Sequence, residues 1–493
     1  MRPLNRQALA ALPPGVVPPP YDRDRVRPGI AHIGVGAFHR AHLAVYVERC
    51  LALPGHEGWG ILGINLLERD RPLAEALAAQ DGLYTVTEMA PDGARVSRVV
   101  GAMVEYLYAP DDPAAVLARL GDPALRVVSL TITEGGYLLD EQGNFKLDDP
   151  TVVHDLARPD APRGAFGFLL GALARRRAAG APPFAIMTCD NLRHNGDQAR
   201  RACLAFARAL DPALAAWVEA EVDFPNAMVD RITPATDDAR RAELDALTGL
   251  DDRAPVVCED YLQWVLEDKF RHGRPAWHEA GAQLVGDVTP YEEAKIRLLN
   301  GAHSMLAYPA FLAGHRGVDE ALGEPLFYEY LREFLAHDAA AWLASLPGMN
   351  LESYQRRLLE RFGNRAVADR LDRLCLDGGS KIPNFLAPTL HDCLAHGHDA
   401  RRLAFLLASY HRYLKAGRDD AGQPYALREP NAMRLLQPII DHGSPLALLE
   451  CEELVGALPA RDARFVAQYL ACRARLDRDG ARATLADLPR LTT

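Results

Sequence analysis

The chain has 493 residues, of which 49% are hydrophobic and 25% charged, a composition typical of a globular protein with two or three domains. Its net charge of −11 argues against a general nucleic-acid binder. No apolar run approaches the roughly 18–20 residues of a membrane span, and the N-terminal segment lacks the apolar core of a signal peptide. Eight cysteines are scattered without a CxxC pair, which is typical of reduced thiols. We therefore expect a cytoplasmic protein with no membrane or nucleic-acid partner.

The first half of the chain alternates short apolar runs with helix-periodic segments. This alternation is typical of an α/β domain whose mostly parallel sheet is covered on both faces. A strand at 29–33 leads into a glycine turn, a helix at 40–53, a loop, and a second strand at 59–67. Further strands are predicted at 84–88, 95–100, 126–132, 184–187, 256–257 and 283–285, and further helices at 114–120 and 164–178.

The turn after the first strand has the pattern Gly34-x-Gly36. A strand, a Gly-x-Gly turn and a helix together bring the backbone close to a pyrophosphate and aim helix N–H groups at it. Gly34 would make the tight turn and Gly36 would leave room for the phosphates. His39 stands where a third glycine is usual, so an ordinary pair of turn glycines is the alternative interpretation.

An acidic pair follows the second predicted strand. Glu68 lies 34 residues after Gly34, whereas the usual spacing is about 20. Glu68 and Asp70 would accept the ribose hydroxyls of NAD and repel the additional phosphate of NADP. Arg69 between them weakens that preference, so the sequence favours NAD without excluding NADP.

From about residue 286 the segments become longer, rich in Ala, Leu and Arg, and helix-periodic. We therefore expect an α/β, dinucleotide-binding domain at 1–285 and an all-helical domain at 286–493. The predicted helices of the second domain are 290–311, 325–345, 351–362, 365–374, 400–416, 431–442, 445–458 and 463–476.

The helix that opens the second domain carries candidate chemistry. Thr289 and Glu292 have the spacing of a capping box. At about 100° per residue, Asn300 lies about 140° and His303 about 80° from Lys295, so all three can face one side. Only five lysines occur among 55 basic residues, and a desolvated lysine, unlike arginine, can release its proton. Lys295 is therefore a candidate proton acceptor, the alternative being an ordinary lysine on a bundle helix.

One group of residues has the composition of a metal site: His391, Cys393, His396 and His398. Its two nearest histidines on a common helix lack the i, i+4 spacing of a helical zinc pair. We expect no metal there or elsewhere.

Seven blocks of the chain resemble the mannitol dehydrogenase family, whose members are metal-independent, long-chain polyol dehydrogenases. They occur in the family's order, from about residue 20 nearly to the C-terminus. The blocks are IAHIGVGAFHRAH (30–42), LTITEGGY (130–137), CDNLRHNG (189–196), FPNAMVDRITP (224–234), QWVLEDKF (263–270), TPYEEAKIRLLNGAH (289–303) and DGGSKIPNF (377–385).

The resemblance implies a Rossmann-type N-terminal domain followed by an all-helical, substrate-binding and catalytic C-terminal domain. It implies that Lys295 is the general base and that Asn191 and Asn300 stabilise the oxygen at the reacting carbon. Glu292 matches a residue associated with proton passage between the lysine and solvent, although the capping box explains it equally well.

The remaining implied site residues bind substrate or cofactor. The stretch Phe38-His39-Arg40 matches the point where the family departs from the three-glycine fingerprint, and therefore belongs to the cofactor site. The positions that match substrate-hydroxyl binding residues are Asp230, His303, Arg373 and Lys381, although Asp230 and Asn191 have ordinary alternatives as turn or cap residues.

The sequence therefore predicts an NAD-dependent polyol dehydrogenase that interconverts a sugar alcohol such as mannitol and its ketose. The resemblance to the family implies a monomer. Arabinitol and sorbitol dehydrogenases and fructuronate and tagaturonate reductases share these motifs and remain alternatives. A hypothesis of a different class is a catalytically silent NAD-binding sensor, against which the intact set of Lys295, Asn300 and Asn191 argues.

Overall fold

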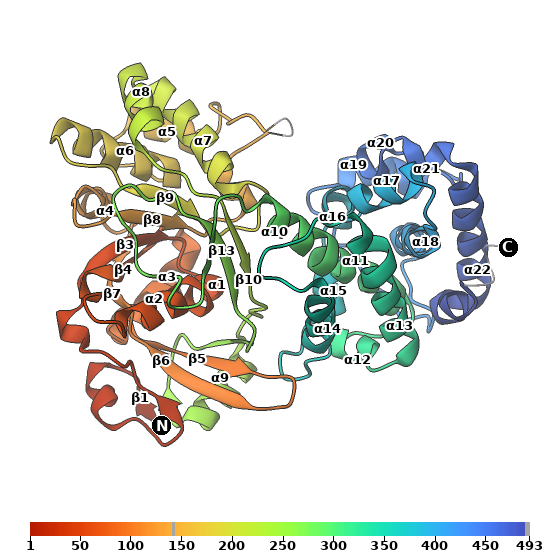
Figure 1. The fold of residues 1–493 in the computed structure, drawn as a ribbon, viewed down its shortest axis with the longest axis horizontal. Helices are drawn as coiled ribbons and strands as arrows, with labels where there is room; N and C mark the ends of the chain where they lie inside the picture. The colour runs from red at the N-terminus through yellow and green to blue at the C-terminus, as the bar shows by residue number, and fades with distance from the viewer. Residues whose placement is uncertain (141–142, 489–493) are drawn as a thin grey trace. The chain divides into compact units, whose positions relative to one another are not determined.

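The computed structural model describes residues 1–140 and 143–488 and separates the chain into two compact units (Figure 1). They are Met1–Thr289 and Pro290–Thr493, whereas the sequence places the boundary near Val285. In the described residues, no helix is both long enough and apolar enough to cross a membrane.

A five-stranded parallel sheet forms the centre of the first unit. Its order is β7-β4-β3-β8-β9, which is the 3-2-1-4-5 order of a Rossmann fold. The predicted fold class is confirmed. In chain order the strands are β3 (Pro28–Ile33), β4 (Gly60–Asn65), β7 (Met103–Tyr108), β8 (Val127–Leu130) and β9 (Ala185–Thr188).

Successive residues of these strands point to opposite faces, and each face has its own core. Ile30 and Ile61 lie in a core with α2 (Leu43–Leu51), while Ala31 and Leu62 lie in the other core. Five α-helices supply residues to that second core: α4 (Pro113–Leu120), α5 (Pro150–Ala157), α6 (Ala165–Ala178), α7 (Asn195–Leu210) and α8 (Pro212–Glu221). Both faces are therefore covered, as expected.

Two further sheets were not anticipated as separate layers. The predicted strands 84–88, 95–100 and 256–257 do not join the parallel sheet, because β5 and β6 form an antiparallel hairpin in a sheet ordered β12-β5-β6-β2. The other sheet is β10-β13-β14. The strands are β2 (Val16–Val17), β5 (Tyr84–Met89), β6 (Arg95–Val100), β10 (Ala227–Asp230), β12 (Val256–Glu259), β13 (Gln263–Glu267) and β14 (Gln283–Val285).

The helix predicted at 40–53 is in fact two helices, α1 (Ala37–Ala41) and α2, which meet at His42. His42 has φ −112° and ψ −88°, outside the helical region. Its Nε2 lies 2.8 Å from the carbonyl oxygen of Gln263, and its ring stacks on Phe38. Other elements of the unit are β1 (Arg2–Pro3), α3 (Arg71–Ala79), α9 (Asp238–Thr248) and β11 (Leu250–Asp251).

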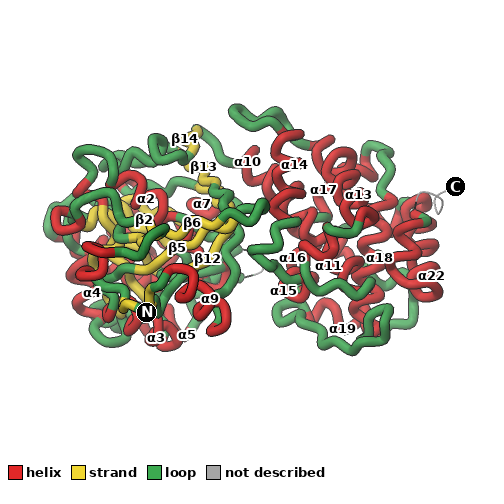
Figure 2. The backbone as a smooth tube through the Cα atoms, turned by 90° about the horizontal axis from the view of Figure 1, so that it is seen from below, coloured by secondary structure: helices red, strands yellow, loops and turns green. Residues whose placement is uncertain are grey.

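The second unit is helical and is built around α11 (Gly301–Leu312). Eleven of the 12 residues of α11 are buried, and His303 is the exception. A helix that is apolar on all sides belongs in a core. Next to it, α18 (Arg401–Ala416) lies between α11 and α22 (Ala463–Ala486) in both views (Figures 1 and 2).

Two predicted helices of this unit contain a π-helix. The segment predicted at 290–311 consists of α10 (Thr289–Ala294), the π-helix η6 (Lys295–Asn300) and α11. The segment predicted at 325–345 consists of α13 (Pro325–Glu333), the π-helix η7 (Phe334–Ala339) and a short 3₁₀ turn. π-Helices are rare and occur mostly as single turns, frequently at functional sites.

Other boundaries in the second unit also differ from the prediction. Only Leu371–Cys375 (α15) of the segment 365–374 is an α-helix, because the chain turns at Ala368 with φ +53°. Two helices with internal or flanking glycine and proline were missed, α16 (Gly378–Phe385) and α17 (Ala387–Ala395). The remaining helices are α12 (Val318–Leu322), α14 (Leu351–Phe362), α19 (Met433–Asp441), α20 (Glu452–Val455) and α21 (Leu458–Arg461).

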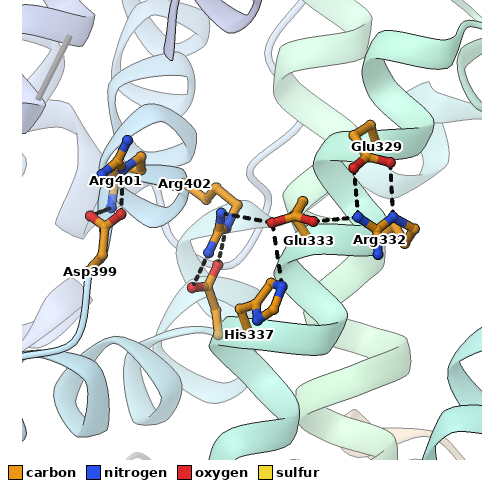
Figure 3. Close-up of polar contacts among 8 residues, drawn as sticks. Glu329, Arg332, Glu333, His337, Asp399, Arg401 and Arg402 are labelled. Carbon is orange, nitrogen blue, oxygen red and sulfur yellow. Dashed lines mark hydrogen bonds and ion pairs between the residues drawn. The ribbon is translucent and has the colours of Figure 1, made fainter. Parts of the chain in front are cut away.

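An ion-pair network fixes η7 to α18 (Figure 3). Arg402 binds Asp338 through two hydrogen bonds of 2.6 and 2.9 Å, and its Nη1 lies 3.7 Å from Glu333. Glu333 also contacts Arg332 of α13. Asp338 is 2% exposed, so the bidentate pair is largely removed from water.

Candidate functional site

The glycine turn after β3 has the geometry that a dinucleotide site requires. Gly34 has φ +95°, and a β-carbon on it would lie 2.1 Å from the carbonyl oxygen of Thr131. Gly36 precedes the first residue of α1, and a β-carbon there would meet nothing closer than the Gly34 oxygen at 3.9 Å. The first glycine is therefore required by the backbone. The second leaves open space at a helix N-terminus, where a phosphate would fit.

Phe38, His39 and Arg40, which stand around the position of the usual third glycine, contact the protein around the glycine turn. The ring of His39 stacks on His32 at 3.5 Å between centroids, and burial holds the pKa of His39 well below its usual value. Arg40 Nε donates to the carbonyl oxygen of Gly36 at 3.1 Å. Phe38 stacks on His42. These side chains therefore stabilise the turn. If a cofactor binds here, these residues would contact it mainly through their backbone groups.

The sequence predicted that the second strand of the sheet ends directly at the acidic pair. The structure separates the two. β4 ends at Asn65, which is buried and donates to the carbonyl oxygen of Val35 at 3.2 Å. Glu68 and Asp70 lie in the following 3₁₀ turn. Glu68 is exposed and its carboxylate lies 4.0 Å from the guanidinium of Arg71, so acidic and basic groups lie side by side in this turn.

Asn191 is exposed and lies in the loop that follows β9. Two nearby residues of this loop region form hydrogen bonds to other segments of the chain. Asp190 accepts hydrogen bonds from the backbone N–H of Ile132 (3.1 Å) and Thr133 (2.8 Å), and burial raises its pKa. Asn195 exchanges two hydrogen bonds with the backbone of Ala227, at 2.7 and 2.9 Å. Sequence reasoning missed Asp190 and Asn195 as positioning residues. The available signal was a run of polar residues directly after a buried strand.

Asp230 is the last residue of β10 and is buried. The next residue, Arg231, joins three parts of the first unit. Its side chain donates to Glu88 Oε1 (2.6 Å) and to the carbonyl oxygens of Ala41 (2.6 Å) and Glu259 (2.9 and 3.1 Å). Arg231 thereby fixes the end of the strand that presents Asp230.

Lys295 and Asn300 are the first and last residues of η6. The N–H of Gly301 donates to the carbonyl oxygen of Ile296, five residues back, so the turn is wider than in an α-helix. The separation of about 140° predicted for an α-helix is therefore wrong, because residues five apart are brought nearer to one face. His303 follows one turn later, on the face of α11 that is not fully buried.

Lys295 and Asn300 lie in a largely buried environment. Lys295 is 9% exposed, so most of the residue is removed from water. The amide nitrogen Nδ2 of Asn300 is buried and has no hydrogen-bond partner among the described residues. An orphaned buried donor is costly unless a ligand oxygen occupies it. Asn300 thus fits a role in binding a substrate oxygen.

Glu292 lies in α10 and is 4% exposed. At the start of this helix the carboxylate of Asp287 accepts both the N–H (2.9 Å) and the hydroxyl (2.6 Å) of Thr289. Asp287, which the sequence did not single out, therefore orders the first turn. Glu292 is a buried carboxyl group three residues before Lys295.

The two predicted substrate-binding cations, Arg373 and Lys381, come from α15 and α16. Arg373 binds Asp369 at both carboxylate oxygens, at 2.7 and 2.5 Å. Lys381 Nζ donates to the carbonyl oxygen of Leu374 at 3.0 Å. Burial, and then the charge of Arg373, lower the pKa of Lys381. The two cations therefore share one small region of the helical unit.

A buried carboxyl group fixes the helix that carries Lys381. Glu429 accepts the N–H of Gly378 and of Gly379, both at 3.0 Å, and the hydroxyl of Tyr410 at 3.0 Å. A β-carbon on Gly378 would lie 2.1 Å from the Tyr308 hydroxyl, so only glycine fits there. Sequence reasoning also missed Glu429, because it lies far along the chain from the motif it supports.

The metal-like cluster is built into the packing of the helical unit. His391 lies 2.7 Å from the carbonyl oxygen of Val455, and Trp342 contacts the rings of His396 and His398. Within 1–140 and 143–488, no three His, Cys, Asp or Glu side chains gather as a metal site.

The chain matches two family models and several known proteins. The mannitol dehydrogenase Rossmann domain matches residues 28–279, and the mannitol dehydrogenase C-terminal domain matches residues 287–471. A Gluconobacter oxydans protein named polyol:NADP oxidoreductase is 46% identical over 451 residues, covering 90% of this chain and 92% of that protein.

Two solved structures are similar over nearly the whole chain. The Pseudomonas fluorescens mannitol 2-dehydrogenase in complex with NAD and D-mannitol is 44% identical, with a TM-score of 0.89, covering 99% of this chain and 100% of that one. A substrate-free D-sorbitol dehydrogenase is 41% identical, with a TM-score of 0.91, covering 98% of this chain and 100% of that one.

Proposed function

Because the chain belongs to the mannitol dehydrogenase family, a family of oxidoreductases that act on CH–OH groups, we propose that it interconverts a sugar alcohol and its ketose with NAD. Mannitol and fructose are the first candidates, since the Pseudomonas relative was solved with NAD and D-mannitol. The observation that carries the proposal is the η6 turn. It combines a nearly buried lysine, Lys295, with an unoccupied amide donor at Asn300.

The cofactor is assigned to the N-terminal unit, at the turn after β3. Gly34 and Gly36 would receive the pyrophosphate, supported by Phe38, His39 and Arg40, and Glu68 and Asp70 would receive the ribose hydroxyls. When bound, NAD supplies the hydride acceptor. The carboxylates of Glu68 and Asp70 favour NAD over NADP, although the Gluconobacter relative is named for NADP and Arg71 lies beside Glu68.

Lys295 is proposed to take the proton of the reacting hydroxyl. A lysine can do so only as a neutral amine, and burial disfavours its charged form. The amides of Asn300 and Asn191 would donate to the oxygen as negative charge develops on it. No metal ion is needed in this scheme, because the amine accepts the proton and the amides stabilise the charge.

The other hydroxyls of the substrate need several polar partners. Arg373 and Lys381 supply positive donors, His303 lies on the accessible face of α11, and Asp230 supplies a carboxylate acceptor. Glu292, a buried carboxyl group one helical turn before Lys295, is proposed to pass the proton between that lysine and solvent.

Sorbitol is the second candidate substrate, because of the similarity to D-sorbitol dehydrogenase. Arabinitol and the uronate reductase substrates complete the panel. The test is to mix the purified protein with NAD or NADP and each polyol and to follow reduced nicotinamide by absorbance. Cofactor binding without reduction by any substrate would favour the sensor hypothesis instead.

A further inference from the structure

The guanidinium of Arg373 is held in one orientation by a single carboxylate. Asp369 accepts Nε–H at its Oδ1 (2.7 Å) and Nη2–H at its Oδ2 (2.5 Å), a fork-to-fork pair that fixes the plane of the guanidinium. The third nitrogen, Nη1, has no hydrogen-bond partner in the part of the chain that the structure describes. The side chain of Arg373 is 55% exposed. One edge of the guanidinium is therefore tied down and another is available to a ligand.

Asp369 is itself rigid. It is 9% exposed, and its carboxylate also accepts the N–H of Arg370 at 2.9 Å. Its carbonyl oxygen accepts the N–H of Val318 at 2.9 Å, and the preceding residue, Ala368, has the left-handed φ of +53°. The backbone at Asp369 is therefore constrained on both sides, which is what a group that orients another side chain requires.

The same carboxylate is electrostatically coupled to His303. Burial would raise the pKa of Asp369, yet this pKa lies below its usual value because the hydrogen bonds and charge of Arg373, followed by the charge of His303, outweigh burial. His303 in turn stacks on Phe362, with 4.1 Å between ring centroids and 13° between planes. Asp369 thus stands behind two of the proposed substrate-binding residues.

We propose that Asp369 is a positioning residue for substrate binding, which holds Arg373 with its Nη1 edge presented to a hydroxyl of the polyol. This inference rests on the proposed function. Asp369 would not touch the substrate, and it would act only through Arg373. The motif that carries Arg373 would then include Asp369, four residues upstream, in the pattern Asp-x-x-x-Arg.

The test is to compare Asp369→Asn with the wild type in the polyol oxidation assay. Removing the outer-shell hydrogen-bond partner of a metal ligand typically costs ten- to a hundredfold in affinity or activity. By analogy, we expect the KM for the polyol to rise by about tenfold. The KM for NAD should not change. Asp372→Asn is the matched control: it removes a carboxylate only three residues further along the chain, but one that pairs with Arg370 at 2.8 Å instead. Its KM should stay within about twofold of the wild type.

A double-mutant cycle separates positioning from general damage. If Asp369 acts through Arg373, Asp369→Asn should add less than about twofold to the polyol KM in an Arg373→Ala background. A merely structural role would add the same factor in both backgrounds, which would overturn the inference. Circular dichroism verifies folding. If Asp369→Asn does not fold, Asp369→Glu, which moves the carboxylate by one methylene, takes its place with the same expectation.

The outcomes distinguish the two proposals. An active wild type whose polyol KM is unchanged by Asp369→Asn overturns only the inference on Asp369. A wild type that binds NAD but oxidises no polyol overturns the proposed function, and the inference with it.

Discussion

Gly301, the residue directly after the π-helix η6, faces Phe334, the first residue of the π-helix η7: a β-carbon on Gly301 would lie 3.4 Å from Phe334 Cζ. It would also lie 3.5 Å from the carbonyl oxygens of Ile296 and Phe385. Phe334 begins η7, and Phe385 ends the helix that carries Lys381. Gly301 follows Asn300 directly, so this close approach connects η7 and the helix that carries Lys381 to the proposed catalytic turn.

This contact predicts a sharp size limit at residue 301. Gly301→Ala should fold and retain activity within about threefold, because its β-carbon finds ordinary van der Waals distances. Gly301→Val should lose about 1–3 kcal/mol of stability through overpacking, and more than about tenfold in kcat if the η6 turn is displaced. Thermal melts and polyol oxidation measure both. Equal activity of the two variants would contradict the predicted limit.

Removing the proposed base should abolish turnover but not cofactor binding. Lys295→Ala should lower kcat by at least about a hundredfold, because general-base catalysis contributes factors of that size. NAD affinity, measured by fluorescence titration, should change little, since the cofactor turn lies in the other unit. Lys415→Ala is the control: that lysine is exposed and donates to the carbonyl oxygen of His442. Near-normal turnover of Lys295→Ala would refute the role of base.

Activity should withstand metal removal. Incubation with excess EDTA followed by gel filtration should leave the rate of polyol oxidation unchanged, since the proposed chemistry uses an amine and two amides. The assay is repeated after adding zinc. A loss on chelation that zinc restores would overturn the metal-independent mechanism.

The buried ion pair of Arg402 with Asp338 should contribute more to the free energy of unfolding than the exposed ion pairs near it. Asp338→Ala leaves the Arg402 guanidinium, 16% exposed, without its bidentate partner, so the free energy of unfolding should fall by about 3 kcal/mol. Glu329→Ala breaks the exposed pair with Arg332 and should cost less than about 1 kcal/mol. Urea unfolding of both variants measures the difference. Equal losses would show that burial is not the deciding factor.

Glu48 should make the stability of the N-terminal unit depend on pH. Burial raises the pKa of Glu48 from 4.5 to about 7, although Tyr21 and Gly101 donate hydrogen bonds of 2.7 and 2.9 Å to it. Because the pKa of Glu48 is higher in the folded than in the unfolded protein, its protonation stabilises the fold fully below about pH 4.5. That stabilisation is lost as the pH rises through about 7. The loss amounts to at most about 3 kcal/mol.

The check is Glu48→Gln, which retains an oxygen to accept both hydrogen bonds but does not titrate. Relative to the wild type, the variant should gain stability between pH 5 and pH 8 in urea unfolding. A difference between the two proteins that does not vary over this range would rule out Glu48 as the titrating group.

Local pattern was sufficient wherever one segment determines its own structure. The strands β6 and β14 and the helix α14 were predicted to the residue, because alternation, flanking turns or amphipathic period define them. Lys295, Asn300 and His303 were also placed on one helical segment from spacing alone. The π turn between them was not predicted, since its extra residue leaves the apolar pattern intact.

Contacts between distant segments could not be predicted from one sequence. β5 and β6 were recognised as strands but assigned to the wrong sheet, because their partners β12 and β2 lie far away along the chain. Asn195 is fixed by Ala227, and Gly378 by Glu429, across 32 and 51 residues. The pairing of Asp369 with Arg373 is local, yet it depends on a left-handed turn at Ala368 that no propensity favours.

The wide turn at η6 means that a regular helix here would be one residue shorter. Deleting a single residue between Lys295 and Asn300 would let α10 and α11 run on as one uniform α-helix, with better backbone hydrogen bonding. That deletion would leave α11 in its present register. A uniform α-helix through all the residues present would instead turn every side chain beyond Asn300 by about 100°, and would carry His303 about 80° away from Lys295. The irregular, locally less favourable coil is therefore what keeps the lysine and the histidine in phase.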